Sequence, residues 1–214
     1  MKKIIIIKGV KLDIERAIKR IRLDIKDDWF QDPLKYEDLL TVDFVISKLS
    51  KYDGVEENYK AGNAIHIDIP KPNFTSRYST EIDIIDRVVY QALVDSIAEE
   101  LDKLHSNHIY SHRINTHRND EKYFFRYAVE EWRKFIIDTS LELDSDNNKV
   151  LLLTDITNFF ENIGIRDLKN VLDLFTPRNE MENDYRACVE MIRLMLGRWC
   201  EKNTLRGIPQ NRDA

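Results

Sequence analysis

Asp155 follows a short apolar segment and a threonine, and two aromatic residues come soon after it. The apolar segment, residues 150–153, comes after a polar cluster typical of a turn, so we expect a buried strand there. A carboxylate at the end of a core strand is costly unless it is hydrogen-bonded, paired with a cation or bound to a metal ion. Active sites of α/β proteins usually lie at strand ends, which makes Asp155 a candidate for chemistry. In the alternative interpretation, Asp155 caps the helix that follows.

A second candidate region lies in the middle of the chain. His105, His108 and His112 have a spacing that a helix would place on one face, as in a zinc site. Ser106 and Asn107 instead favour a turn. The neighbouring side chains favour a nucleic-acid surface over a metal site, and they are basic or aromatic: Arg113, Arg118, Lys122, Arg126, Tyr110 and Tyr123. The alternative is an ordinary solvated face.

The composition predicts a folded protein. The chain has 214 residues, of which 43% are apolar and 33% are charged, and its formal net charge is -5. This size is enough for one large domain or two small ones, and no apolar run approaches a membrane span or a signal-peptide core. Two cysteines without metal-ligand spacing argue against a disulfide scaffold and fit a reducing cytoplasm. The acidic balance argues against an overall basic coat but leaves a local nucleic-acid groove open.

The periodicity of apolar residues predicts the elements that hold these side chains. Leu12, Ala17 and Ile21 indicate a helix near the N-terminus, and residues 64–69 alternate like a short strand. Helical spacing recurs in four later segments, which we expect to be helices: 81–104, 119–137 with Asn119 as its cap, 165–175 and 180–202. Helices interleaved with short strands indicate a mixed, helix-rich α+β chain.

Four sequence blocks stand in the order found in reverse transcriptases. Residues 150–163 contain a hydrophobic run and then Asp-Ile-Thr-Asn-Phe-Phe-Glu-Asn-Ile, which resembles motif A of that family. Arg77 stands nine positions before residues 86–93, Asp-Arg-Val-Val-Tyr-Gln-Ala-Leu, which are similar to a fingers block of bacterial and group II intron-like enzymes. Residues 110–113 resemble the next fingers block, and residues 207–210, Gly-Ile-Pro-Gln, resemble the start of motif B. From Arg77 onward, therefore, the chain resembles a reverse transcriptase.

The N-terminal residues narrow this resemblance. Residues 17–22 and 27–38 are similar to the abortive-infection, defence-associated reverse transcriptases of bacteria. The resemblance implies a right-hand fingers–palm fold, with an N-terminal helical segment (1–60), fingers (61–149) and a partial palm (150–214). It implies an RNA-directed DNA polymerase of antiphage defence in the cytoplasm. The implied partners are an RNA template or associated non-coding RNA, the DNA product, dNTPs and further copies of the chain, with no membrane.

The same resemblance implies roles for eight residues. Asp155, with the main-chain carbonyl of Ile156, would hold two catalytic Mg2+ ions, which Mn2+ can replace. Phe160 takes the position of the steric gate that excludes a ribose 2′-hydroxyl, unless it is a core residue like its neighbour. The other implied contacts are with the incoming nucleotide, from Arg77, Lys71 and Gln210, and with nucleic acid, from Arg87 and Arg113. The alternative for Arg77 and Lys71 is a solvated surface pair.

The chain departs from the family pattern in two places. Asn211 stands where a glycine usually follows Gln210, which removes backbone freedom near the template. The aromatic-x-Asp-Asp block of motif C, which supplies further metal ligands, does not occur before Ala214. We therefore expect polymerase activity to require residues beyond Ala214, and this chain alone to be inactive. The alternative functions are a non-catalytic RNA-binding or assembly fragment, and a retron or group II intron-type reverse transcriptase.

Overall fold

The computed structural model describes residues 4–7, 9–27, 40–50, 59–71, 75–116, 122–145 and 150–209. The N-terminal part contains the antiparallel pair β1 (Ile4–Ile7) and β2 (Val10–Asp13), then α1 (Ile14–Asp24), the 3-10 turn η1 (Ile25–Asp27) and α3 (Val42–Leu49). An antiparallel hairpin follows, made of β3 (Ile65–Lys71) and β4 (Thr75–Glu81). The remaining elements are helices: α5 (Ile84–Asp102), α6 (Ala128–Leu143), α7 (Phe159–Asn162), α8 (Ile165–Leu174) and α9 (Glu182–Trp199).

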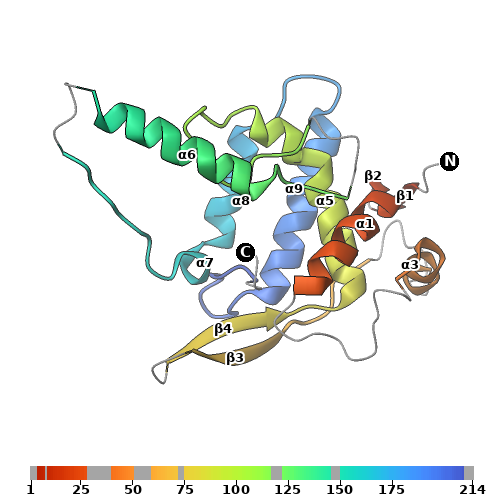
Figure 1. Cartoon of the computed structure of the whole chain (residues 1–214). Coiled ribbons are helices and arrows are strands. Elements are labelled where there is room, and N and C mark those ends of the chain that lie inside the picture. The colour runs from red at the N-terminus through yellow and green to blue at the C-terminus, as the bar shows by residue number, and fades with distance from the viewer. Residues whose placement is uncertain are drawn as a thin grey trace.

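The core is built around α5. Figure 1 shows α5 with α1 on one side and α9 on the other, and both pairs of helices are in contact. Val88, Val89 and Leu93 of α5 are fully buried, as are Ala17 of α1 and Val189 of α9. One hydrophobic cluster includes residues from all three expected divisions of the chain, 1–60, 61–149 and 150–214. The boundaries between these divisions therefore stay a prediction. The described part of the protein is thus a mixed, helix-rich α+β structure with small antiparallel sheets.

Several predicted elements are confirmed. The segments 81–104, 165–175 and 180–202 contain α5, α8 and α9, and the alternating segment at 64–69 forms most of β3. The N-terminal prediction is only partly right, because Leu12 lies in β2 and the helix begins at Ile14. Asp13 sets this boundary, since its Oδ1 accepts a hydrogen bond from the main-chain N–H of Arg16 at 3.0 Å.

The expected buried strand at residues 150–153 is wrong. These residues have no strand conformation, and their exposed fractions run from 54% at Leu151 to 87% at Val150. A buried strand needs neighbours that satisfy its backbone N–H and C=O groups. No segment within the described ranges pairs with residues 150–153. The apolar side chains therefore remain on the surface of the structure.

The helix expected at 119–137 begins later than predicted. Asn119, the expected cap, lies outside the described residues, and α6 starts at Ala128. The residues before it pair with the segment after α5 instead. The N–H of Asn115 donates to the carbonyl of Phe124 at 3.0 Å, and the N–H of Arg126 donates to the carbonyl of Arg113 at 2.9 Å. These sheet-like bonds compete with helix and delay its first turn.

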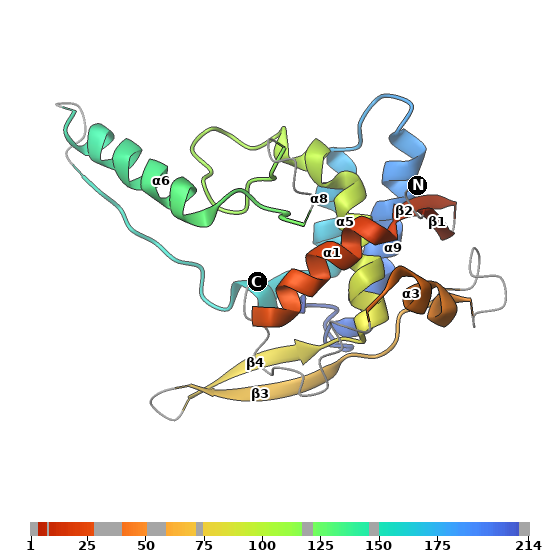
Figure 2. The same ribbon diagram turned by 45° about the vertical axis from the view of Figure 1, so that its right-hand side comes forward.

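Helix α6 extends away from the core. Figure 2 shows it projecting from the molecule, and residues 150–158 lead toward α7. Trp132 and Leu141 on this helix are 60% and 66% exposed. Of the helices in the described ranges, none has the length and apolar character required to cross a bilayer.

Candidate functional site

Asp155 lies in the segment of residues 150–158, which contains neither helix nor strand, and its side chain is exposed. Its Oδ1 accepts a hydrogen bond from the main-chain N–H of Ile156 at 2.9 Å. Helix α7 begins after Asn158, whose φ of 51° lies in the left-handed region. The interpretation of Asp155 as the cap of the next helix is therefore wrong. Its carboxylate is accessible to a ligand from solvent.

The segment that resembles motif B lies against the segment that resembles motif A. The N–H of Ile208 donates to the carbonyl of Phe160, and the N–H of Gly207 donates to the carbonyl of Ile163, each at 3.0 Å. Gly207 has a φ of +88°, a conformation that side chains other than glycine's strongly disfavour. The turn at Gly207 thus holds two distant parts of the sequence together. Gln210, the next candidate along, lies outside the described residues.

A cavity of about 790 Å³ lies between α1, the end of β4, α5, α9 and residues 122–128. Arg87 and Gln91, from the block that resembles fingers, line it together with Ile208 and Pro209. Its volume falls within the roughly 300–1,000 Å³ of typical ligand sites. Asp155 does not line this cavity. The structure therefore brings residues of the 86–93 block and of the 207–210 block to one cavity, while the 150–163 block contacts the 207–210 block.

A buried group of charges stands beside this cavity. Asp95 is 7% exposed and accepts hydrogen bonds from Arg20 and, at 2.6 Å, from Nε2 of Gln91. Arg16 approaches the second carboxylate oxygen at 3.4 Å. Burial raises the pKa of Asp95, and the two arginine charges and the Gln91 hydrogen bond oppose that shift. The group fastens α1 to α5 and fixes Arg20, whose guanidinium lies 4.6 Å from the centre of the Phe124 ring.

Arg87 and Arg113, the two candidates for nucleic-acid contact, differ in their surroundings. Arg87 lines the cavity, and its Nη2 lies 4.0 Å from Oδ2 of Asp24. Arg113 is engaged by Asp102, with its Nε 2.9 Å from Oδ1 and its Nη2 3.2 Å from Oδ2. Asp102 also accepts the main-chain N–H of Ile114 at 2.9 Å. These bonds give Arg113 a structural role, and its contact with nucleic acid stays a prediction.

Replacing Arg113 with alanine is expected to destabilise the fold by about 2 kcal/mol at neutral pH, because Asp102 would keep a largely buried charge without its main partner. Burial opposes ionisation of Asp102, but the hydrogen bonds from Arg113 and Ile114 outweigh it and lower the pKa of Asp102 below its ordinary value. The pair stabilises the protein above a pH of about 4 and loses this effect as the pH falls through the lower pKa. Denaturant unfolding of parent and variant at several pH values measures the difference.

The control for this variant is Lys103→Ala, which removes a neighbouring exposed cation that pairs with Glu100. It is expected to change the free energy of unfolding by less than about 0.5 kcal/mol at any pH. An Arg113→Ala effect as small as that of the control, or one that does not shrink in acid, would contradict the structural role.

Lys71 and Arg77 lie on the two strands of the hairpin. Lys71 ends β3 and Arg77 lies within β4, where it pairs with Ile69. The structure describes the backbone of both residues, and their side chains lie outside the described part. The hairpin projects below the helices in Figure 1 and leads directly into α5. Their contacts with a nucleotide stay a prediction.

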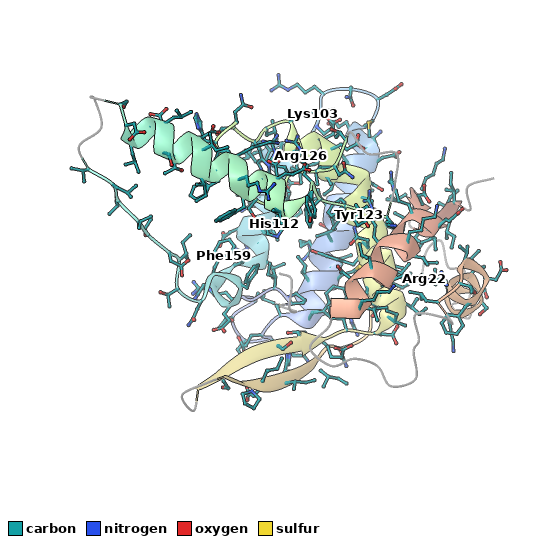
Figure 3. The ribbon with its side chains drawn as sticks, viewed as in Figure 1. Arg22, Lys103, His112, Tyr123, Arg126 and Phe159 are labelled. Carbon is teal, nitrogen blue, oxygen red and sulfur yellow. The ribbon has the colours of Figure 1, made fainter. Side chains whose placement is uncertain are left out.

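Phe160, the expected steric gate, is half-buried in α7. Its ring lies 5.3 Å from that of Phe159, which is 48% exposed, and the two rings meet edge to face. Figure 3 shows Phe159 at the α7 side of the molecule, away from α1. Neither ring lines the 790 Å³ cavity. The pair lies five residues or fewer from Asp155, on the same short segment.

Asp155 and Ile156 offer the kind of donor that Mg2+ prefers. This ion takes oxygen ligands and is usually held by one or two carboxylates together with substrate phosphates and water. Asp155 supplies one carboxylate, and Ile156 has a main-chain carbonyl beside it. Among the residues that the structure describes, no group of three His, Cys, Asp or Glu side chains is placed to hold a metal ion. The donors fit an Mg2+ whose remaining ligands come from a substrate and from further oxygen groups.

Comparison of this chain with protein-family models, with curated proteins and with solved structures finds no match. The assignment of function therefore rests on the residues and on their arrangement.

Sequence reasoning missed most of the residues that line the cavity. Arg20, Tyr90 and Trp199 come from three different helices, and no short motif joins them. Residues 122–125 carry a further signal, since a lysine is followed there by three aromatic residues. The sequence marks Lys122 and Tyr123 as part of a nucleic-acid surface but does not indicate which elements they face.

Proposed function

We propose that the chain is part of an RNA-directed DNA polymerase of bacterial antiphage defence, with a right-hand fingers–palm arrangement and a cytoplasmic location. One observation carries the proposal: the segment that resembles motif B is hydrogen-bonded to the segment that resembles motif A and lines one cavity with residues of a block that resembles fingers. Gly207 and Ile208 are hydrogen-bonded to the segment after Asp155, and Ile208 lines a cavity with Arg87.

Six of the candidate residues would act directly in nucleotidyl transfer. When bound, Mg2+ supplies electrostatic stabilisation of the attacking 3′-hydroxyl and of the leaving phosphate oxygens. Asp155 and the carbonyl of Ile156 would hold it. Arg77 and Lys71 would bind the triphosphate of the incoming dNTP, for which a guanidinium provides paired donors. Gln210 would contact the nascent base pair, and Arg87 the template.

The direct test is incorporation of labelled dNTPs on an RNA template by the protein that the complete gene encodes. Reading the gene past the codon for Ala214 comes first, because an aromatic-x-Asp-Asp block there would provide the missing carboxylates. Mg2+-dependent or Mn2+-dependent DNA synthesis would support the proposal. A complete protein that contains the block and makes no DNA with any template or with dNTPs alone would contradict it.

Replacing Phe160 with alanine is expected to admit ribonucleotides. The aromatic ring would crowd a 2′-hydroxyl, and removing a clash of this kind changes discrimination by about 1–3 kcal/mol, or roughly 5-fold to 150-fold. The ratio of kcat/KM for a dNTP and the matching rNTP measures the effect. Phe159→Ala is the matched control, because it removes the neighbouring ring from the same helix. Equal ratios in the two variants would remove the gate role from Phe160.

A second candidate function is non-catalytic binding of RNA. It is favoured by the cavity itself, whose lining includes Arg20, Arg87 and Lys122 beside aromatic rings. Binding through phosphate contacts weakens steeply as salt rises. RNA binding with a steep salt dependence, together with no DNA synthesis by the complete protein, would favour this function over the polymerase. A retron or intron-type enzyme would share the residues described above.

A further inference from the structure

Aromatic rings line the 790 Å³ cavity on two sides. Tyr123, Phe124 and Phe125 come from the segment that leads into α6, and Tyr90 and Trp199 come from α5 and α9. The Tyr90 and Trp199 rings meet edge to face, with their centres 5.5 Å apart. Trp199 is only 2% exposed, so the rings open to a flat aromatic group are those of the first side, and every nucleobase has a π-face that stacks on such rings.

The rings of the first side are held in place by neighbouring side chains. Arg20 lies over the Phe124 ring at 4.6 Å and is itself held by the buried Asp95. The backbone at Phe124 accepts a hydrogen bond from Asn115. Phe124 and Phe125 lie 4.6 Å apart, and His112 meets Phe125 edge to face at 4.9 Å. A platform fixed in this way loses little conformational entropy when a ring stacks on it.

The charged side chains of the cavity are mixed, with cations in excess. Arg20, Arg87 and Lys122 line it, and His112 adds a ring nitrogen. The acidic lining residues are Asp24 and Glu81, and Asp24 pairs with Arg87 at 4.0 Å. Lys122 lies over the Tyr123 ring at 4.8 Å, which places a cation beside an aromatic platform. In Figure 3, His112 and Tyr123 both lie in the middle of the molecule, between α6 and α1.

We propose that this cavity holds one unpaired nucleotide of a single-stranded polynucleotide. Its base stacks against Tyr123 and Phe124, and its phosphate lies toward Lys122 and Arg87. The inference rests on the proposed function only in taking this strand to be the template, which would enter between α1 and the 122–128 segment. The binding itself requires neither Asp155 nor a metal ion, and it adds Arg20 and Phe124 to the candidate residues for nucleic-acid binding.

The test measures binding of a fluorescent oligouridylate RNA of about 12 nucleotides to the 214-residue chain by anisotropy, without metal ions. Tyr123→Leu and Phe124→Leu are each expected to weaken binding about tenfold or more, since stacking contributes strongly to single-strand affinity. Tyr123→Phe keeps the ring and is expected to bind like the parent. Tyr127→Leu is the matched control, because Tyr127 is 52% exposed, belongs to the same segment and does not line the cavity.

Failure of the nucleotide site and failure of the proposed polymerase function give different results in these binding and synthesis assays. Tyr123→Leu and Phe124→Leu variants that melt like the parent and bind like Tyr127→Leu would overturn the nucleotide site, whatever the polymerase assay shows. Competition by dNTP or inorganic triphosphate as strong as by unlabelled RNA would also overturn it, because the cavity would then be a triphosphate site. Asp155→Asn is expected to bind the RNA like the parent. Its activity in DNA synthesis bears only on the proposed function.

Discussion

Replacing Asp155 with asparagine is expected to abolish dNTP incorporation by the protein that the complete gene encodes. Asparagine keeps the size of the side chain and can still accept the hydrogen bond from the Ile156 N–H. It loses the negative charge that would hold Mg2+, and a metal ion stabilises the charge of the transition state by several kcal/mol. Because each 1.4 kcal/mol changes a rate tenfold, the rate should fall about a thousandfold or more. Single-turnover incorporation with saturating dNTP measures it.

The matched control is Glu161→Gln, which removes one exposed carboxylate from α7, six residues further along the chain. Its rate should stay within about threefold of the parent, since a screened surface charge contributes little. Raising Mg2+ or Mn2+ should rescue Asp155→Asn partly or not at all. Incorporation by Asp155→Asn at the parent rate would contradict the assignment of Asp155 to metal binding and the assignment of residues 150–163 as motif A.

Long periodic segments were predicted well from the sequence, for a local reason. In α5, the apolar side chains of Val88, Val89, Ala92 and Leu93 recur with the helical period, and all are buried. The N-cap of this helix is Asp83, whose side chain accepts from the N–H of Ile85 at 2.9 Å. The helical spacing of apolar residues and the N-cap residue are both local features of the sequence, so such a helix can be predicted before its neighbours are known.

Segments whose conformation depends on distant partners were predicted poorly. Residues 150–153 have the composition of a buried strand, but composition alone supplies no partner for the backbone. Residues 122–127 have helical spacing, yet the N–H groups of Asn115 and Arg126 bind carbonyls across the two segments and hold an extended pair. In both cases the conformation depends on whether a distant segment supplies hydrogen-bond partners for the backbone.

The candidate site divides along the same line. Asp155, Phe160 and Ile208 belong to blocks that can be recognised in the sequence. The structure places Phe160 and Ile208 in contact through a main-chain hydrogen bond. The cavity depends on the packing of α1, α5 and α9, so Arg20, Tyr90 and Trp199 carry no local signature. Arg113 shows the reverse case. It lies in a block of suggestive residues, but Asp102, which lies at the end of α5, engages its guanidinium.

Asp86 belongs to a block that resembles polymerase fingers, and the structure gives it a task in stability. It is 4% exposed and accepts hydrogen bonds from the hydroxyl of Tyr59 at 2.5 Å and from the N–H of Gly62 at 2.6 Å. The carbonyl of Gly62 in turn accepts from Nε1 of Trp199 at 3.2 Å. Asp86 therefore ties residues 59–62 to α5, and Trp199 ties them to α9.

Asp86→Ala is expected to lower the free energy of unfolding by about 3 kcal/mol. The variant removes the carboxylate that accepts from the Tyr59 hydroxyl and from the Gly62 N–H, and the loss of each of these hydrogen bonds costs about 1–3 kcal/mol. At roughly 2–4 °C per kcal/mol for a chain of this size, the melting temperature should fall by about 10 °C. Thermal and denaturant unfolding measure both quantities. A melting temperature within about 2 °C of the parent would contradict the role given to Asp86.

Asp86→Asn separates the hydrogen bonds from the charge. Its amide oxygen can accept from Gly62, and its NH2 can donate to the Tyr59 oxygen, so most of the stability should remain. Burial raises the pKa of Asp86, while the bonds from Tyr59 and Gly62 oppose the shift. A raised carboxyl pKa means that the parent is stabilised below a pH of about 4 and loses that contribution as the pH rises through the folded-state value. The asparagine variant cannot ionise, so its stability relative to the parent should increase between acid and neutral pH. A constant difference across that range would show that Asp86 ionises in the folded protein as easily as in the unfolded chain.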